Sequence, residues 1–248
     1  MKIVLLIAGK GRRLKQLTEN NHKALINLDE NSLLHHLIEN CLYAGLNDFV
    51  PIVGHCSDQI VKEFSKKYSK NINVSWVLNK EYSTKNNLHS ILCAKHILKG
   101  QEFILCNADI VFDRRIMKKI AEMDGLSSIA IDDFEYIEPI ESPGICMQNG
   151  KISDLGRHIQ FRDNMGYAIG IYKFNKELSD AFFDEAEKML DCDSNAGFHE
   201  PLPELFNKIN VYKCKTAGKL WTDIDTFADI EKAKDIHKKI MEGYASNE

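Results

Sequence analysis

The segment from Leu6 to Leu25 joins two close glycines to two basic residues, directly after an apolar run. Gly9 and Gly11 carry no Cβ, so the backbone N–H groups around them can approach an anion closely. Arg13 adds a guanidinium that pairs bidentately with phosphate, and Lys23 adds a compact positive charge. This combination predicts a cradle for the phosphates of a nucleoside triphosphate.

Two better-known glycine loops do not fit this segment. The dinucleotide fingerprint GxGxxG would need a third glycine where the chain has Leu14. The P-loop needs GxxxxGK followed by Ser or Thr, whereas Gly9, Lys10 and Gly11 are followed by Arg12. The plain alternative is an ordinary strand-to-helix turn with basic residues on its surface.

Three aspartates are placed where they could bind a metal ion. Asp109 follows an apolar strand pattern, and Asp223 and Asp225 stand two residues apart, on one face if that segment is extended. Mg²⁺ prefers a few carboxylates together with phosphate oxygens and water, so we predict a Mg²⁺ site formed by these three residues. The alternative for each aspartate is a helix N-cap.

The opening segment resembles the nucleotidyltransferase superfamily that makes nucleotide-sugars and CDP-alcohols. The superfamily motif is LxAGxGxRLxxLTxxxPKxLxxL, and His22 stands here in place of its proline. The motif positions that match are Gly9, Gly11, Arg13, Leu14, Leu17, Thr18, Lys23, Leu25 and Leu28. The resemblance implies catalytic roles for Arg13, Lys23 and Asp109. It also implies a nucleotide site made of Ile7, Ala8, Gly9, Gly11, Arg13, Lys23, Asn87, Ser90, Asn107 and Asp109.

The segment from Asn79 to Ser90 reads NxxYxxxNNxxS, which resembles phosphocholine cytidylyltransferases and their CTP-using relatives. Two amides and a hydroxyl can donate to and accept from the edge of cytosine, which favours CTP. Asn87 and Ser90 are therefore the best candidates for nucleotide contact. The alternative is a polar cap on the helix that begins near Asn87.

The second substrate is expected to be a small phosphorylated zwitterion. Arg157, His158, Tyr167, His199 and Glu200 offer charge and hydrogen bonds in the second half, and Arg162 lies near them. No tryptophan occurs between Pro139 and Pro203, so an aromatic cage for choline is not expected there. The chain resembles most the CTP-dependent enzymes that convert L-glutamine phosphate to CDP-L-glutamine in capsule modification. Phosphocholine, 2-aminoethylphosphonate and sugar 1-phosphates remain as alternative acceptors.

A phosphate acceptor is anionic at neutral pH, so the expected reaction needs no general base. Attack on the α-phosphorus of the triphosphate would depend on alignment and on charge neutralisation by Mg²⁺, Arg13 and Lys23. The histidines therefore receive no catalytic role, and His35 and His36 are expected to be packing or surface residues in a helix.

The elements that must position these residues alternate between strand and helix patterns in the first half of the chain, which predicts βαβ units. Expected strands are 3–7, 49–53, 74–78 and 103–106, and expected helices are 32–43, 58–68 and 87–98. Shorter strands follow at 128–131, 145–148, 151–155 and 167–174, with helices at 176–189 and in the tail. We predict an α/β fold with a Rossmann-like, mixed but mainly parallel sheet flanked by helices.

Length and charge bound the remaining choices. The 248 residues carry a net charge of -4, which gives no indication of binding to nucleic acid or membranes. No apolar run approaches the roughly 18 residues that a membrane span needs, and a cytoplasmic location is expected. We expect one domain over 1–248, with a nucleotide-binding half at about 1–110 and an acceptor and metal half at about 111–248. The resemblance allows a homodimer, and no sequence feature decides it.

Overall fold

The structure is a computed structural model that describes residues 1–68, 72–132, 142–159 and 166–245. Its strands are β1 (Lys2–Ile7), β2 (Asp48–Val53), β3 (Asn73–Val74), β4 (Val77–Leu78), β5 (Phe103–Asn107), β6 (Ile110–Phe112), β7 (Ser127–Asp132), β8 (Gly144–Gln148), β9 (Lys151–Gly156), β10 (Tyr167–Phe174), β11 (Val211–Lys215) and β12 (Trp221–Asp223). Its helices are α1 (Leu33–Tyr43), α2 (Ser57–Tyr68), α3 (Asn87–Cys93), α4 (Lys95–Leu98), α5 (Arg114–Ala121), α6 (Lys176–Cys192), α7 (Pro203–Phe206) and α8 (Phe227–Ala245), with 3₁₀ helices η1 (Arg12–Thr18) and η2 (Lys23–Leu25).

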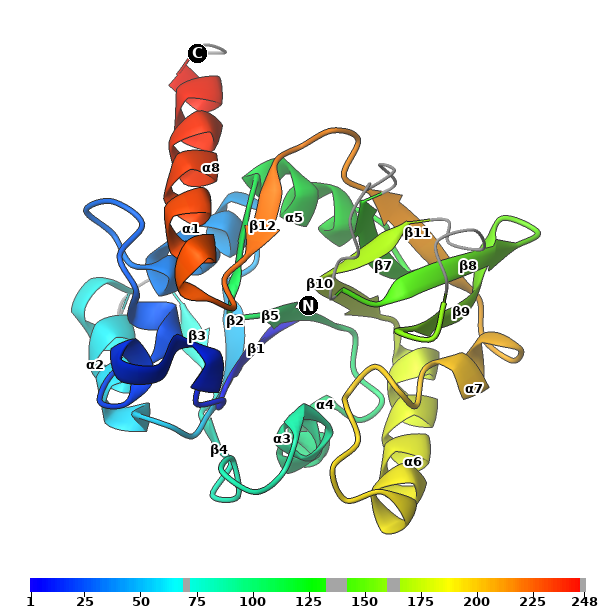
Figure 1. Cartoon of the computed structure of the whole chain (residues 1–248). Helices are drawn as coiled ribbons and strands as arrows, with labels where there is room; N and C mark the ends of the chain where they lie inside the picture. The colour runs from blue at the N-terminus through cyan, green and yellow to red at the C-terminus, as the bar shows by residue number, and fades with distance from the viewer. Residues whose placement is uncertain (69–71, 133–141, 160–165, 246–248) are drawn as a thin grey trace.

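The main sheet has the strand order β11-β7-β10-β5-β1-β2-β3. Strand β1 is parallel to β2 and β5, and β11 is parallel to β7, whereas β10 runs antiparallel to both β5 and β7. Strand β8 pairs with β9 and with one end of β10, and β12 forms a separate antiparallel pair with β6. Figure 1 shows this sheet between helices, and the prediction of a mixed, mainly parallel α/β fold is confirmed.

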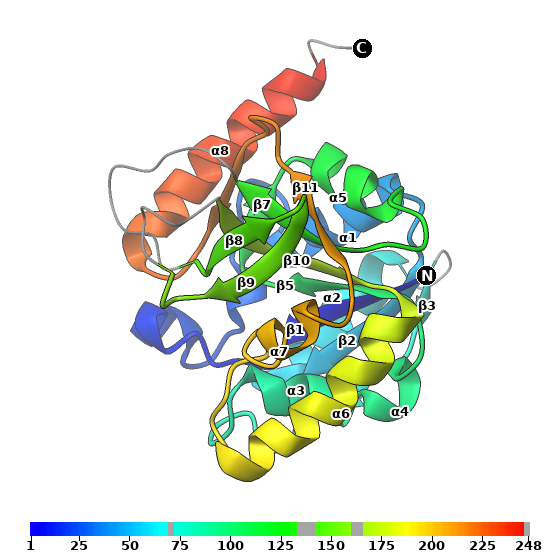
Figure 2. The same ribbon diagram turned by 90° about the vertical axis from the view of Figure 1, so that its right-hand side faces the viewer.

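Two apolar clusters cover the opposite faces of the sheet because successive strand residues point to opposite sides. In β1, Ile3 and Leu5 belong to a cluster that also includes residues of α1, α2, α5 and α8. Val4 points the other way, into a cluster with residues of α3, α4, α6 and α7. Figure 2 shows α3, α4 and α6 together on their side of the sheet. The fully buried strands at the centre explain the continuous apolar runs in the sequence.

Two elements differ from the sequence prediction. The expected strand 74–78 is two short strands, β3 and β4, which pair with opposite ends of β2. Trp76 lies between them, outside both strands, and is 38% exposed. Its ring packs edge-on against Phe64, with 5.1 Å between ring centroids. The expected helix 87–98 is divided into α3 and α4 at Ala94.

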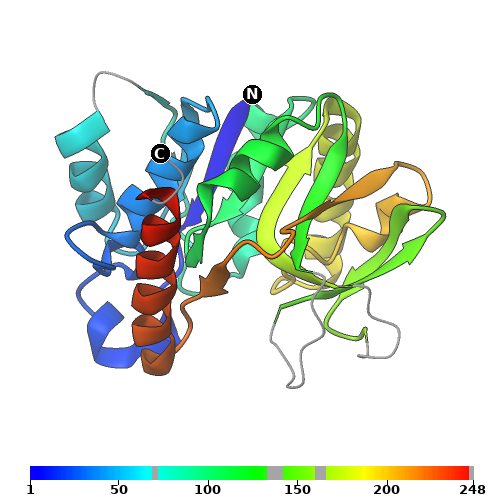
Figure 3. The same ribbon diagram turned by 90° about the horizontal axis from the view of Figure 1, so that it is seen from above.

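The strand ends bring distant parts of the chain to one edge of the sheet. Leu6 near the end of β1 is paired with Asn107 at the end of β5, so the segments that follow both strands emerge together. Asp223 is paired with Ile110, and the Ile224 N–H donates to the Asp109 carbonyl at 2.8 Å. Figure 3 shows β12 leading directly into α8. Residues near 9, 109 and 225 therefore meet at this edge.

None of the helices in the described ranges combines the length and apolar character that a membrane crossing requires.

Candidate active site

The glycine loop after β1 folds tightly onto the two 3₁₀ helices. Gly11 has φ 60° and ψ 43°, a left-handed conformation that favours glycine. A Cβ at Gly11 would lie 3.3 Å from the Thr18 methyl group and 3.4 Å from the Cβ of Lys23. The Thr18 hydroxyl donates to the Gly11 carbonyl at 2.9 Å. Glycine is therefore needed at this position for both conformation and space.

His22, which replaces the motif proline, caps η2. Its Nδ1 accepts a hydrogen bond from the Ala24 N–H at 3.0 Å, and the residue is only 4% exposed. Burial, together with the nearby His55, lowers the pKa of His22 to about 4. The imidazole is thus neutral at pH 7 and supplies a cap that proline cannot provide, which fixes the turn that carries Lys23.

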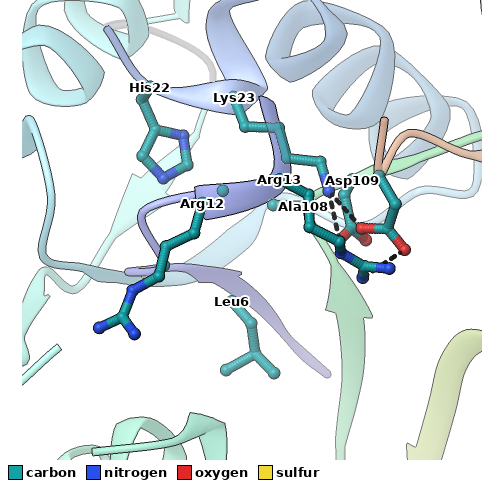
Figure 4. A pocket seen from close by; sticks show the side chains of 10 residues that line it. Leu6, Arg12, Arg13, His22, Lys23, Ala108 and Asp109 are labelled. Carbon is teal, nitrogen blue, oxygen red and sulfur yellow. Dashed lines mark hydrogen bonds and ion pairs between the residues drawn. The ribbon is translucent and has the colours of Figure 1, made fainter. Parts of the chain in front are cut away.

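Lys23 and Arg13 form a chain of ion pairs with two of the predicted aspartates. The Lys23 Nζ lies 3.0 Å from Asp109 Oδ2 and 2.9 Å from Asp225 Oδ1. Arg13 Nη2 lies 2.8 Å from Asp225 Oδ2. Burial alone would lower the pKa of Lys23, but Asp109 and Asp225 outweigh it and raise the pKa. Figure 4 shows the ammonium of Lys23 beside Asp109.

Asp223 belongs to the same acidic group. Burial is the largest cause that raises the pKa of its carboxyl, followed by repulsion from Asp225 and Asp109. A nearby cation stabilises the charged form of a carboxyl whose pKa is raised in this way. Asp223, Asp225 and Asp109 thus offer oxygen donors of the kind that Mg²⁺ prefers.

These carboxylates are not gathered into a finished metal site. Across residues 1–68, 72–132, 142–159 and 166–245, no three His, Cys, Asp or Glu side chains are arranged to hold a metal ion. The ion pairs of Lys23 and Arg13 already involve Asp109 and Asp225. The donor chemistry fits a divalent cation. In this arrangement, Lys23 and Arg13 are paired with carboxylate oxygens that such a cation would use.

A pocket of about 260 Å³ lies over the glycine loop and holds most of the predicted phosphate ligands (Figure 4). Its lining is Leu6, Gly9, Gly11, Arg12, Arg13, His22, Lys23, Ala108, Asp109 and Asp225. Within this lining, Lys23 and Arg13 are paired with Asp109 and Asp225. This arrangement suits a triphosphate with its counter-ion.

A second pocket, of about 230 Å³, adjoins the first. Its lining is Arg13, Asn87, Asn107, Asp109, Ile110, Ser142, Pro143, Arg157, Ala168, Ile169, Gly170, Tyr172, Phe198, His199, Trp221, Asp223 and Asp225. Arg13, Asp109 and Asp225 line both pockets. The two pockets therefore meet at Arg13, which can pair with a phosphate, and at two carboxylates, which can hold a cation.

The predicted acceptor residues divide into two groups. Arg157 and His199 line the second pocket, and burial lowers the pKa of His199. His158 instead pairs with Asp154 at 2.9 Å, and its side chain is 66% exposed.

Glu200 and Tyr167 were predicted to bind the acceptor, but neither is among the residues that line the second pocket. Glu200 Oε1 accepts from the Gly197 N–H at 2.8 Å, which shapes its own loop. Tyr167 is 8% exposed in β10. Arg162 lies outside the described residues. Arg157 and His199 are thus the predicted acceptor residues that this pocket brings together.

Asn87 and Ser90 differ in their access to the site. Asn87 lines the second pocket, and its Oδ1 accepts from the Phe198 N–H at 2.8 Å. Ser90 is 5% exposed, and its hydroxyl accepts from Asn79 Nδ2 at 2.9 Å. Ser90 is not among the residues that line this pocket, whereas Asn87 is.

Sequence reasoning missed the aromatic lining of the second pocket. Trp221, Tyr172 and Phe198 come from three distant segments and line it together. The Tyr172 and Phe198 rings meet edge to face with centroids 4.9 Å apart, and Trp221 Nε1 donates to Asp132 Oδ2 at 2.6 Å. The argument against an aromatic cage rested on the lack of tryptophan between Pro139 and Pro203, and it is corrected because Trp221 reaches this pocket from β12. The only sequence signal was the proximity of Trp221 to Asp223.

Several known proteins are similar in sequence to this chain. CTP:phosphoglutamine cytidylyltransferase of Campylobacter jejuni is 27% identical over 93% of this chain and 98% of that protein. A bifunctional IPC transferase and DIPP synthase of Aquifex aeolicus is 29% identical over 93% of this chain, which spans only 50% of that protein. Choline-phosphate cytidylyltransferase of Streptococcus pneumoniae is 36% identical over 42% of this chain and 43% of that protein.

Solved structures share the fold. The inositol-1-phosphate CTP transferase of T. maritima matches with a TM-score of 0.82 at 18% identity, covering 98% of this chain and 96% of that one. CTP:phosphocholine cytidylyltransferase of Streptococcus pneumoniae matches with a TM-score of 0.79 at 21% identity, covering 95% and 98%. Residues 2–135, more than half of the chain, match the family described as Nucleotidyl transferase. The chain belongs to the nucleotidyl transferase family.

Proposed function

We propose that this protein is a cytidylyltransferase that transfers CMP from CTP to a small phosphorylated acceptor and releases pyrophosphate. The observation that carries the proposal is the junction of two pockets at Arg13, Asp109 and Asp225. The first pocket suits the triphosphate, and the second suits an acceptor whose phosphate must reach the α-phosphorus. The relatives that use CTP support cytosine as the base.

Asp109, Asp223 and Asp225 would hold Mg²⁺ together with phosphate oxygens. When bound, the ion supplies charge neutralisation and orientation for the triphosphate. Lys23 and Arg13 act on the same phosphates, with Arg13 placed at the junction of the pockets. An acceptor phosphate oxygen attacks the α-phosphorus, and the bond to the pyrophosphate oxygen breaks in the same displacement. No side chain has to remove a proton, because the attacking oxygen is already anionic.

L-glutamine phosphate is the acceptor we place first, which gives CDP-L-glutamine, a product for capsule modification. Arg157 can pair with a carboxylate or a phosphate, and it lines the second pocket with His199. The Campylobacter relative, matched over nearly its whole length, supports this choice.

Phosphocholine is the second candidate. Trp221, Tyr172 and Phe198 give the second pocket an aromatic lining. Aromatic faces attract a quaternary ammonium group, so this observation favours choline over an acceptor recognised only by charged groups.

The test is pyrophosphate release by the purified protein with Mg²⁺. CTP, UTP, ATP and dTTP are each combined with L-glutamine phosphate, phosphocholine, 2-aminoethylphosphonate and a hexose 1-phosphate. We expect turnover with CTP and L-glutamine phosphate. Turnover with CTP and phosphocholine would support the aromatic lining as the recognition surface, and preference for UTP or dTTP with the hexose phosphate would contradict the proposal.

A further inference from the structure

The Lys23 ammonium lies between two carboxylates that a divalent ion would use. Its Nζ is 3.0 Å from Asp109 Oδ2 and 2.9 Å from Asp225 Oδ1. Arg13 binds the other oxygen of Asp225 at 2.8 Å. Both oxygens of Asp225 and one oxygen of Asp109 are thus paired with protein cations. A metal ion that binds these oxygens has to displace at least the ammonium of Lys23.

Displacement of Lys23 without a new partner would be costly. The residue is only 8% exposed, so its charge cannot simply move into water. A buried charge that loses its partner carries a large desolvation penalty. Lys23 also lines the pocket over the glycine loop, where phosphate oxygens could replace the carboxylates as its partners. The same side chain is therefore within the reach of both sets of oxygens.

We propose that Lys23 exchanges partners during substrate binding: its ammonium leaves Asp109 and Asp225 for triphosphate oxygens, and the divalent ion takes its place. The consequence is that the ion enters the site together with the triphosphate rather than before it. This inference rests on the proposed function for the triphosphate and the ion, and it does not depend on the base or the acceptor.

The test measures binding of Mn²⁺ alone by electron paramagnetic resonance, without nucleotide. The wild-type protein is compared with Lys23→Gln, which keeps a polar side chain of similar length but no charge. Removing one positive charge within hydrogen-bond distance of two carboxylates should tighten Mn²⁺ binding by about tenfold or more. Lys2→Gln is the matched control, because it removes another lysine from an ion pair, with Asp48 at 2.9 Å. It should bind Mn²⁺ like the wild type.

A second measurement separates exchange from a merely structural role. Inorganic tripolyphosphate should bind more weakly to Lys23→Gln than to the wild type, so one substitution moves the two affinities in opposite directions. Lys23→Arg, which keeps the charge, should bind Mn²⁺ as weakly as the wild type. If Lys23→Gln binds Mn²⁺ no more tightly than the wild type, or loses both ligands, the exchange is overturned.

Failure of the Lys23 exchange can be distinguished from failure of the proposed function. Mn²⁺ and tripolyphosphate contain neither a base nor an acceptor. Turnover with another nucleotide or acceptor would overturn the proposed substrates and leave the opposite shifts of the two affinities unchanged.

Discussion

The three residues at the junction of the pockets form one charged chain with Lys23, in the order Arg13, Asp225, Lys23 and Asp109. Each inner member serves two partners, so a change in one side chain alters the charge balance of the others. Because these groups are partly buried, removal of one partner leaves a poorly solvated charge. Substitutions of these four residues should affect both catalysis and stability, so enzymatic activity and unfolding have to be measured separately.

Replacement of Asp109 by Asn should reduce pyrophosphate release by about a hundredfold or more, because the proposed Mg²⁺ site loses one of its carboxylates and the charge on the reacting phosphates is then less well neutralised. The backbone bond from Ile224 to the Asp109 carbonyl is kept, so the local fold should persist. Steady-state kinetics with Mg²⁺ and CTP measure the effect, and circular dichroism checks folding. Asp48→Asn, which disturbs a remote ion pair, is the control. Turnover near the wild-type rate would exclude Asp109 from the reaction centre.

Replacement of Arg157 by Ala should raise the acceptor KM by about tenfold, since a charged hydrogen bond contributes roughly 1.5–3 kcal/mol. The KM for CTP should change little, because Arg157 lines only the second of the two adjoining pockets. Arg157→Lys retains the charge without the bidentate geometry, so its acceptor KM should lie between those of the wild type and Arg157→Ala. Equal increases in both KM values would show that Arg157 does not select the acceptor.

At the level of elements, close contact between β10 and β5 shapes the second pocket. Gly170 in β10 has φ +92°, and a Cβ there would lie 2.9 Å from Asn107 Nδ2. The β10–β7 register also shifts between Ala168 and Tyr172, so this strand is irregular beside the site. The glycine lets Asn107 lie against the β10 backbone and face the pocket.

Replacement of Gly170 by Ala should lower the free energy of unfolding by about 1–3 kcal/mol, through the left-handed φ and the clash with Asn107. It should also raise the acceptor KM. Gly125→Ala is the matched control, because Gly125 has φ +67° but open space around its missing Cβ. Urea unfolding and acceptor kinetics measure both effects. A normal acceptor KM in Gly170→Ala would contradict the link between Asn107 and the pocket.

The elements also show what the sequence could and could not predict. The edge that carries Gly9, Lys23 and Asp109 follows from parallel strands whose ends share one side, and the apolar runs reveal those strands. The aromatic lining depends on where β12 pairs with β6 and β10 with β5, and no local pattern encodes those registers. Ser90 and Glu200 were chosen for their chemistry, but hydrogen bonds from Asn79 and Gly197 already engage the Ser90 hydroxyl and one Glu200 carboxylate oxygen.

For the whole molecule, we infer that the nucleotide and acceptor halves form one domain. The main sheet runs without interruption from β11 and β7 through β10 and β5 to β1 and β2. Residues on both sides of 110 occur in each of the two apolar clusters. A boundary at about 110 would have to divide both the sheet and its core, so the halves should unfold together.

Acid should destabilise the whole fold below about pH 6.5. Burial lowers the pKa of His36 to about 3 and, with His55, that of His22 to about 4, so both are neutral in the folded protein. The unfolded chain binds protons near pH 6.5, so their stabilising contribution is complete above that pH and falls toward pH 4. At pH 5, protonation of each histidine in the unfolded chain should lower the free energy of unfolding by about 2 kcal/mol.

Urea unfolding at pH 7 and pH 5 measures this loss. His36→Gln cannot take up a proton, so its stability should fall less between the two pH values than that of the wild type. Equal pH dependence in both proteins would contradict the role of His36.

Because the two pockets share Arg13, Asp109 and Asp225, a single compound can occupy both of them across this junction. A bisubstrate inhibitor that joins a cytidine phosphate to the acceptor would lose its translational and rotational freedom once instead of twice. The product of the proposed reaction is itself such a compound. The product should therefore compete with both CTP and the acceptor. The rate of product release would then limit the turnover rate of the enzyme.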